Sequence, residues 1–502
     1  MDPLTLFKNT YSTILLIFSI TIVMGLIFTS QTSLSSDVHP ALAFVVIWLA
    51  IIWLSMVEGG QASFVGLAPV KTSLYKDSHP IAYKCGSLVH KGDNLDRYLL
   101  GRQFMVVLIV FVVNLCGVPL SDAELWGLPK IITDIFLVTG FAMILFTCMV
   151  GQLNSQVNAS HCMLDYINNY FALFTLWVAM AIEFSGLLHA SYLVQFLVAA
   201  LAGQKIESNE EPKTGLNLAF FWFRCFLSLA ILVACFAVTL KALFNGQTTM
   251  WDGVPEAVSI ILFFLLVSVV GMLEGMQIAF FAVAKLPEDE RGEARFAKMT
   301  CDLLFSGKGR NLPGFMIGRQ LCVVSCFFII ARVTTLDIGD DEANIFGVTD
   351  GLQEFFNTGL CGAIITTIIG SISWQLVASA FPIAFLSNPI TYILLRICLL
   401  LEATGIASGS WVLAAIHKKI ANFQRDEVYI GTAEERAAKE LGDDEDEIGV
   451  GAGHPRKLPG FAESAPPALK KLLEEDSAVE SYLRNELNLG KEEVTDTDDV
   501  EA

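Results

Sequence analysis

The chain has 502 residues, of which 54% are hydrophobic and 17% charged, and its formal net charge is −19. A mean hydropathy of +0.58 excludes an ordinary soluble protein, which needs more polar surface at this length. The lack of a basic face excludes a nucleic-acid-binding protein. Eleven cysteines without a CxxC pair give no reason to expect a disulfide framework or a zinc finger.

Long apolar runs define the fold class. A membrane-spanning helix needs about 20 residues to cross about 30 Å of hydrocarbon, and ten runs reach or approach that length. They cover residues 11–30, 40–57, 103–118, 130–150, 167–203, 217–243, 256–283, 316–333, 352–377 and 388–416. We therefore predict an all-α polytopic membrane protein with ten transmembrane helices in a lipid bilayer, followed by a soluble tail.

Short motifs recur in the two halves of the apolar region, in the same order and at offsets of 216 to 223 residues. Such regular recurrence indicates an internal duplication. The pairs are Glu58-Gly59-Gly60-Gln61 with Glu274-Gly275-Met276-Gln277, Gly101-Arg102-Gln103 with Gly318-Arg319-Gln320, Gln152-Leu153 with Gln375-Leu376, and Asn169 plus Glu183-Phe184-Ser185-Gly186 with Asn388 plus Glu402-Ala403-Thr404-Gly405.

The duplication divides the apolar region into two predicted repeats, residues 1–203 and 204–416, each with five spans. Because five is odd, the second repeat would enter the membrane from the opposite side. This is the inverted-repeat plan of many secondary transporters. A duplicated scaffold without a transport role is the alternative.

The first recurring motif places ionisable groups inside apolar runs, where they are costly and usually face a cavity. Glu58 and Gln61 share one helix face because they lie three residues apart, and so do Glu274 and Gln277. Carboxylate and amide groups suit a neutral polyhydroxy solute or a hard cation, and neighbouring glycines let a ligand or backbone approach. Alternatively, each Glu pairs with the arginine of the second motif as a structural brace.

The second motif places Arg102-Gln103 and Arg319-Gln320 at the openings of two predicted spans. Arginine provides fixed planar donors and the adjacent amide adds a donor and an acceptor, so these residues are candidates for binding the solute. The alternative is an interfacial anchor whose charge reaches the lipid headgroups.

The run 167–203 is too long for one span, since a single helix of that length would measure roughly 54 Å. Ser185-Gly186 interrupts it, and Thr404-Gly405 interrupts run 388–416 at the matching place. Glycine-interrupted spans at corresponding positions indicate a binding site, and unwound backbone frees carbonyl groups for sodium. We predict that Glu183 and Glu402 lie near mid-membrane and face the interior. The alternative places each Glu at a helix end near the interface.

Residues 417–502 form a predicted acidic tail. The segment after residue 419 has 22 acidic and 9 basic side chains, and so carries −13 of the net charge. Residues 443–460 predict a disordered linker, and the leucines of 466–490 allow a short coiled coil and thus self-association. Basic residues in loops 69–102 and 284–315 leave the positive-inside rule undecided. We place both termini in the cytoplasm because a large charged tail is hard to translocate.

Paired EGxQ and GRQ motifs in a ten-span protein resemble the silicon (silicic acid) transporters of diatoms, and Cys162-Met163-Leu164-Asp165 matches a further motif of that family. The resemblance covers residues 1 to about 417. It implies sodium-coupled uptake of silicic acid at the plasma membrane, with intracellular membranes as a further location, and a cytoplasmic tail prone to form a coiled coil. No enzyme activity and no cofactor are expected, sodium being the coupling ion.

The chemistry of silicic acid fits the candidate residues. It is a small neutral tetra-ol that needs several donors and acceptors, and its uphill uptake requires a coupled ion because it carries no charge. We expect a secondary active symporter that works by alternating access. The alternatives are a passive channel for a small neutral hydroxylated solute, and a membrane receptor or scaffold. The predicted binding residues are Glu58, Gln61, Arg102, Gln103, Glu183, Glu274, Gln277, Arg319, Gln320 and Glu402.

Overall fold

The computed structural model describes residues 3–431, with gaps at 37, 69, 121–122, 204–212, 252, 285–293, 307–310 and 340–341. The described residues are helical, and their β-type pairings are two isolated bridges, Thr32 with Pro119 and Thr248 with Leu336. The all-α prediction is therefore confirmed for this part of the chain. The predicted linker and coiled coil of the tail lie outside the described residues.

The described residues of the first half form ten α-helices, two short 3-10 turns and two π-helical segments. The α-helices are α1 (Pro3–Phe28), α2 (Pro40–Leu67), α3 (Pro80–Val89), α4 (Asn94–Gly117), α5 (Lys130–Thr133), α6 (Phe141–Phe146), α7 (Asn154–His161), α8 (Met163–Ile167), α9 (Tyr170–Phe184) and α10 (Ala190–Ala202). The 3-10 turns are η1 (Ser33–Ser36) and η2 (Thr72–Tyr75), and the π-helical segments are η3 (Asp134–Val138) and η4 (Thr147–Leu153).

The second half has a closely similar order of elements. Its α-helices are α11 (Gly215–Asn245), α12 (Glu256–Ala284), α13 (Arg295–Phe305), α14 (Asn311–Thr334), α15 (Asp350–Asn357), α16 (Leu360–Ile365), α17 (Ser373–Ala380), α18 (Pro382–Leu386), α19 (Pro389–Ala403) and α20 (Gly409–Ala421). A 3-10 turn, η7 (Ile345–Gly347), a π-helical segment, η8 (Thr366–Ile372), and a last short helix, α21 (Glu427–Ile430), complete the described chain. The segments η4 and η8 begin 219 residues apart, close to the offset of the sequence motifs.

Seven helices in the described part of the chain are long and apolar enough to cross a membrane, and an eighth span results if the pair Lys130–Val138 and Phe141–His161, bent by 51°, counts as one. These helices support a multi-pass membrane protein. The fifth and tenth predicted spans are different, because each consists of two helices of 15 and 13 residues. At about 1.5 Å per residue, neither piece alone crosses about 30 Å.

The predicted interruptions of these two spans are confirmed. Gly186 lies between α9 and α10 with φ of 84°, and Gly405 lies between α19 and α20 with φ of 72°. Both glycines adopt the left-handed conformation that side-chain-bearing residues rarely take. Asn169 and Asn388 cap the starts of α9 and α19, where each side-chain oxygen accepts a backbone N–H.

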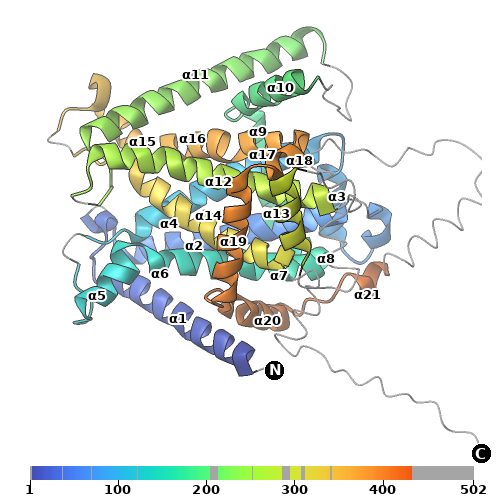
Figure 1. The fold of residues 1–502 in the computed structure, drawn as a ribbon, viewed down its shortest axis with the longest axis horizontal. Coiled ribbons are helices and arrows are strands. Elements are labelled where there is room, and N and C mark those ends of the chain that lie inside the picture. The colour runs from blue at the N-terminus through green and yellow to red at the C-terminus, as the bar shows by residue number, and fades with distance from the viewer. Residues whose placement is uncertain are drawn as a thin grey trace, which may run out of the picture.

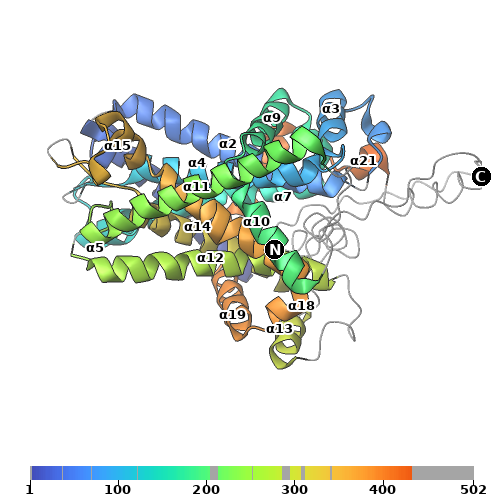
Figure 2. The same ribbon diagram turned by 90° about the horizontal axis from the view of Figure 1, so that it is seen from above.

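Helices α4 and α14 contact each other at the centre of the molecule, and 83% and 78% of their most apolar windows are buried. Helix α1 lies along one side of the molecule and α11 along the opposite side (Figure 1). Seen from above, α3 and α9 lie on one face and α13 and α19 on the other (Figure 2). The polar motifs of α4 and α14 are therefore enclosed by the remaining helices.

The last helix of each half packs against the other half: α10 contacts α11 and α17, and α20 contacts α1 and α7. Two serines fix these contacts. Ser228 of α11 donates to the Leu187 carbonyl at 2.6 Å and accepts from the Ala190 N–H at 2.9 Å. Ser12 of α1 does the same at the second break, donating to the Ile406 carbonyl at 2.6 Å and accepting from the Gly409 N–H at 2.8 Å.

The predicted boundary of the tail falls inside the packed body. Residue 417 lies within α20, and the backbone N–H of Gln424 and the Asp426 carboxylate form hydrogen bonds to α8 and its first turn. The segment predicted as tail from residue 417 is therefore packed on the first half as far as residue 430, because its polar groups find partners there.

The glycine that precedes each Arg-Gln pair allows two backbones to touch. A Cβ atom added at Gly101 would lie 1.9 Å from the Ala179 carbonyl oxygen of α9, and one added at Gly318 would lie 1.9 Å from the Cys398 carbonyl oxygen of α19. Because the obstructing atoms belong to helix backbone, neither site can relax by moving a side chain.

We expect Gly101→Ala and Gly318→Ala each to lower the stability of the purified protein by about 3 kcal/mol, since each forces two helices apart. Gly351→Ala is the matched control, because a Cβ atom there meets nothing within 4 Å, and its effect should stay within about 1 kcal/mol. Thermal unfolding in detergent measures the difference. Equal melting temperatures for the three variants would contradict this view of the packing.

Candidate functional site

Glu58 and Arg102 form a buried ion pair between α2 and α4. Arg102 Nη1 lies 3.4 Å from Glu58 Oε2, and Arg102 Nη2 donates to the side-chain oxygen of Gln103. Two amides also reach the carboxylate: Gln156 of α7 donates to Oε2 at 3.0 Å, and Gln152 of η4 donates to Oε1 at 3.4 Å. The glutamate of the first recurring motif thus belongs to a cluster of one carboxylate, one guanidinium and several amides.

The second half builds a matching cluster between α12 and α14. Arg319 Nη2 lies 3.1 Å from Glu274 Oε2, and Arg319 Nη1 donates to Gln320 Oε1 at 2.8 Å. Gln375 of α17 donates to Glu274 Oε2 at 2.8 Å. The carboxylate, guanidinium and amide groups of this cluster are therefore arranged like those of the cluster around Glu58.

One hydrogen bond joins the two clusters, because Gln320 Nε2 donates to Gln152 Oε1 at 2.7 Å. We name the whole set the central polar chain. Its charged groups are between 3% and 5% exposed, and two carboxylates balance two guanidinium groups. The central polar chain consists of Glu58, Arg102, Gln103, Gln152, Gln156, Glu274, Arg319, Gln320 and Gln375.

Both arginines keep a donor that the described residues do not use. The Nε of Arg102 and the Nε of Arg319 are buried, and neither has a hydrogen-bond partner in the described part of the chain. A buried donor without a partner costs about 1–3 kcal/mol. A small solute rich in oxygen would satisfy these donors without changing the net charge of the site.

The prediction that the Arg-Gln pairs open two spans is wrong. Helix α4 begins at Asn94 and α14 at Asn311, so Arg102 and Arg319 each lie eight residues inside their helices. Both guanidinium groups are buried and paired, which excludes the interfacial anchor. The hydropathy pattern missed the helix starts because α4 begins with a polar turn, residues 94–97, and α14 has Pro313-Gly314, typical loop residues, near its start. The ion pairs that the brace alternative predicts are present.

The glycines of the first motif make room for aromatic rings rather than for a ligand. A Cβ atom added at Gly59 would lie 2.3 Å from the ring of Tyr166 on α8, and one added at Gly275 would lie 2.5 Å from the ring of Phe385 on α18. The two rings take corresponding positions in the two halves. Each ring therefore packs beside the glutamate of the first motif.

Gln61 and Gln277 are not part of the central polar chain. Both are partly exposed, and no described hydrogen bond connects them to Glu58 or Glu274. Three residues along a helix place a side chain about 4.5 Å further along the axis and turned by about 60°. This separation is enough to leave both amides outside the clusters, and their binding role stays a prediction.

Glu183 and Glu402 lie in the last turns of α9 and α19. These two helices lie on opposite faces of the molecule (Figure 2). Glu183 is buried and accepts a hydrogen bond from the Tyr192 hydroxyl at 3.2 Å, with His189 Nε2 at 3.7 Å. Glu402 is partly exposed and lies near Gly314. The position of both residues at helix ends matches part of the alternative, which placed each Glu at a helix end near the interface. The depth of both carboxylates in the membrane stays a prediction.

The carbonyl groups freed at the two breaks already have donors. Arg224 Nη1 donates to the Phe184 carbonyl at 3.0 Å, and the Tyr11 hydroxyl donates to the Thr404 carbonyl. Ser228 and Ser12 take two further carbonyls, as described above. The expectation that unwound backbone offers these oxygens to sodium therefore loses its support.

Comparison of the two halves of the sequence missed one member of the central polar chain, Gln156, and wrongly paired two others, Gln152 and Gln375. Gln152-Leu153 was matched with Gln375-Leu376 at an offset of 223, but η4 and η8 set an offset of 219. At that offset Gln156 corresponds to Gln375, and both donate to the glutamate of their own half. The Asn169 and Asn388 caps, which share the offset of 219, are the signal that identifies Gln156.

Long apolar helices that enclose a buried, charge-balanced polar chain define a multi-pass membrane protein whose interior suits a polar solute. The Silicon transporter family model matches residues 1–501, so the chain belongs to the silicon transporter family. Membership confirms the resemblance found in the motifs and implies transport of silicic acid rather than enzyme catalysis. Neither the comparison with curated proteins nor that with solved structures gives a match.

We expect Gln152→Leu to lower the stability of the protein by about 1–3 kcal/mol, because it leaves the Gln320 amide without its acceptor. The control is Ser371→Ala at the corresponding position, since the buried Ser371 hydroxyl has no hydrogen-bond partner in the described residues and its removal should be neutral. Thermal unfolding of both variants tests the link between the halves. A Gln152→Leu variant as stable as the parent would show that the hydrogen bond between Gln320 and Gln152 contributes nothing to stability.

Proposed function

We propose that the protein is a sodium-coupled secondary active transporter that takes up silicic acid by alternating access. The observation that carries this proposal is the central polar chain, which is buried, balanced in charge and built from both halves. A transporter of this kind needs a site that two halves share, so that movement of one half against the other changes the side from which the site is reached.

The groups of the central polar chain suit silicic acid. The unused Nε–H of each arginine is a donor for a hydroxyl oxygen, and the carboxylates and amide oxygens accept hydroxyl protons. Because silicic acid is neutral, its binding leaves the balance of Glu58, Arg102, Glu274 and Arg319 unchanged. Gln103 and Gln320 complete the set of binding residues that we propose.

The arrangement of the helices supports an inverted repeat of five plus five spans, with limits at 1–203 and 204–416. The two halves share the order of their main elements, and α1 and α11 lie on opposite sides of the molecule (Figure 1). In this proposal α9 with α10, and α19 with α20, act as the fifth span of each half.

Sodium coupling follows from the neutrality of the solute, which the membrane potential alone cannot concentrate. We assign the ion to the carboxylates, Glu183 and Glu402 included, because carboxylate oxygens suit a hard cation. The plasma membrane, cytoplasmic termini and association through the tail are further parts of the proposal.

Uptake of silicic acid into proteoliposomes tests the proposal. An inward sodium gradient should drive accumulation above the external concentration, and accumulation should stop when sodium is equal on both sides. Equilibration without accumulation would identify a passive channel instead. No uptake by correctly inserted protein would point to a receptor or scaffold.

We expect Glu58→Gln and Glu274→Gln each to reduce sodium-driven uptake by about tenfold or more, because each removes a charged acceptor worth about 1.5–3 kcal/mol. Gln has nearly the same shape and still offers the arginine an acceptor oxygen, so both variants should remain folded, although each should be less stable than the parent because the buried guanidinium loses its counter-charge. Glu354→Gln, at an exposed position of α15, is the control. Uptake at the parent rate in both variants would make these carboxylates structural.

A further inference from the structure

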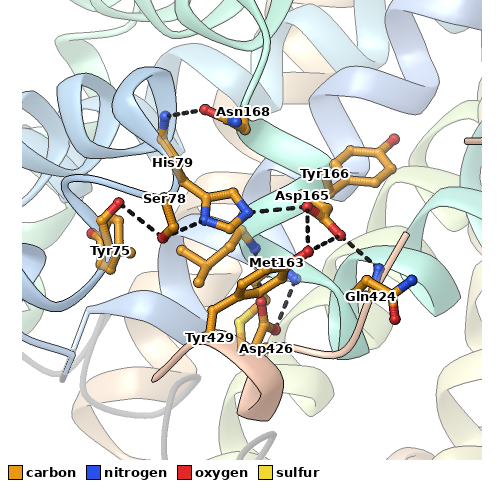
Figure 3. A network of polar contacts seen from close by, with 12 residues as sticks. Tyr75, Ser78, His79, Met163, Asp165, Tyr166, Asn168, Gln424, Asp426 and Tyr429 are labelled. Carbon is orange, nitrogen blue, oxygen red and sulfur yellow. Dashed lines mark hydrogen bonds and ion pairs between the residues drawn. The ribbon is translucent and has the colours of Figure 1, made fainter. Parts of the chain in front are cut away.

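The Cys162-Met163-Leu164-Asp165 motif takes no part in the central polar chain but forms a second polar cluster (Figure 3). The motif begins α8, the short helix that carries Tyr166. Asp165 Oδ1 lies 3.0 Å from His79 Nε2, and His79 Nδ1 lies 2.9 Å from Ser78 Oγ. The motif therefore links α8 to the residues that precede α3.

The chain that leaves α20 adds to this cluster. Helix α20 ends where Asn422 adopts a left-handed conformation with φ of 54°. Asp426 is 4% exposed, and its two carboxylate oxygens accept the backbone N–H groups of Met163 and Leu164, each at 2.8 Å. The Asp426 N–H donates to the His161 carbonyl at 3.2 Å. Asp426, in the segment that follows α20, thus fixes the start of α8.

Asp165 provides the second attachment. Its Oδ2 accepts the Gln424 N–H at 2.6 Å and lies 3.4 Å from the Tyr429 hydroxyl. The Tyr429 ring packs edge-on against the His79 ring, with centroids 4.4 Å apart. Figure 3 shows these groups converging on Asp165. Residues 423–429 therefore contact α8 through both backbone and side chains, and we name them the clamp.

Helix α8 connects the clamp to the Glu58 end of the central polar chain. The Tyr166 hydroxyl donates to the Ser55 carbonyl at 2.8 Å, and its ring covers Gly59. Phe423 of the clamp packs 5.9 Å from the Tyr166 ring. A cavity of about 340 Å³ lies between α2, α8 and the clamp, with Ser55, Tyr166 and Phe423 in its lining. Ser55 is one helical turn from Glu58 on α2, so the cavity beside the clamp lies about one turn from that carboxylate.

In the described residues of the second half, α18 has no counterpart of the Asp165 attachment, and residues 204–210, which correspond to the clamp at the offset of 219 residues, lie outside the described residues. At the offset of 219 residues, Phe381 takes the place of Cys162 and Ala384 takes the place of Asp165. Phe385 covers Gly275 as Tyr166 covers Gly59, but neither Phe381 nor Ala384 carries a carboxylate. The carboxylate that Asp165 provides in the first half is thus missing from the corresponding position of α18.

We propose that residues 423–429 form a regulatory clamp that holds α8 and Tyr166 against α2, so that the segment leading to the carboxy-terminal tail controls access to the Glu58 end of the central polar chain. Asp426 and Asp165 are positioning residues in this scheme, since they act through α8. The clamp is defined by contacts, so it can be tested separately from sodium coupling and transport.

Alkylation of Cys162 by a maleimide measures the state of the clamp. Cys162 is 0% exposed, and burial raises the pKa of its thiol to about 12, so labelling should be slow in the intact protein. We expect Asp426→Ala to accelerate labelling of Cys162 by about tenfold or more, because it removes two hydrogen bonds to α8. Peptide mass spectrometry assigns the labelled cysteine.

Two controls make the test specific. Glu427→Gln changes an exposed neighbour in the same segment and should leave the labelling of Cys162 unchanged. In a Cys162→Ser background, Phe381→Cys reports on the corresponding position of the second half, and Asp426→Ala should not alter the labelling of that cysteine. Acceleration at both positions would indicate general loosening and would overturn the assignment to one half.

Truncation separates the clamp from the rest of the tail. Ending the chain after residue 431 should leave labelling of Cys162 slow, whereas ending it after residue 421 should reproduce the Asp426→Ala rate. If Asp426→Ala does not fold, Asp165→Ala removes the other attachment and should also accelerate labelling. Parent-like labelling in folded Asp426→Ala or Asp165→Ala protein would overturn the proposal.

Discussion

Two buried ion pairs, Glu58 with Arg102 and Glu274 with Arg319, are the constraint on which the rest of the structure depends. A single charge inside a membrane costs several kcal/mol, and removing one partner of a buried pair leaves the other uncompensated. The helices that carry these residues must therefore keep α2 against α4, and α12 against α14, at separations of 3.4 and 3.1 Å between charged atoms. Gly101 and Gly318 let α9 and α19 pack directly against the same two central helices.

The last helix of each half packs against the other half, and these contacts link the two halves around α4 and α14. Because α10 rests on the second half and α20 on the first, a movement between the halves has to be absorbed near Gly186 and Gly405. Ser228 and Ser12 hold the breaks in the state described here. The halves differ, however, at Gln152 and Ser371, and at Asp165 and Ala384. A transporter with two equivalent halves gains from such differences, since they allow its two sides to be controlled separately.

The sequence predicted the helical class, the recurring motifs, the broken spans and the family, because hydropathy and motif order depend on local residues. It misplaced Arg102 and Arg319, since a polar first turn in α4 and Pro313-Gly314 in α14 look like loops when the helices that cover them are unknown. It assigned Gly59 and Gly275 to the approach of a ligand or of backbone, because only the fold brings Tyr166 and Phe385 over them. The clamp could not be predicted either. Asp426 lies in a polar segment that resembles the tail, and its partners are about 260 residues away.

Equilibrium binding of silicic acid to the purified protein tests the central claim most directly. The account predicts saturable binding that strengthens in sodium, and loss of that binding in a folded double variant with Glu58→Gln and Glu274→Gln. Thermal unfolding of the same samples separates loss of binding from loss of fold. Unchanged binding by the folded double variant would contradict the account, because the solute would then lie elsewhere than on the central polar chain.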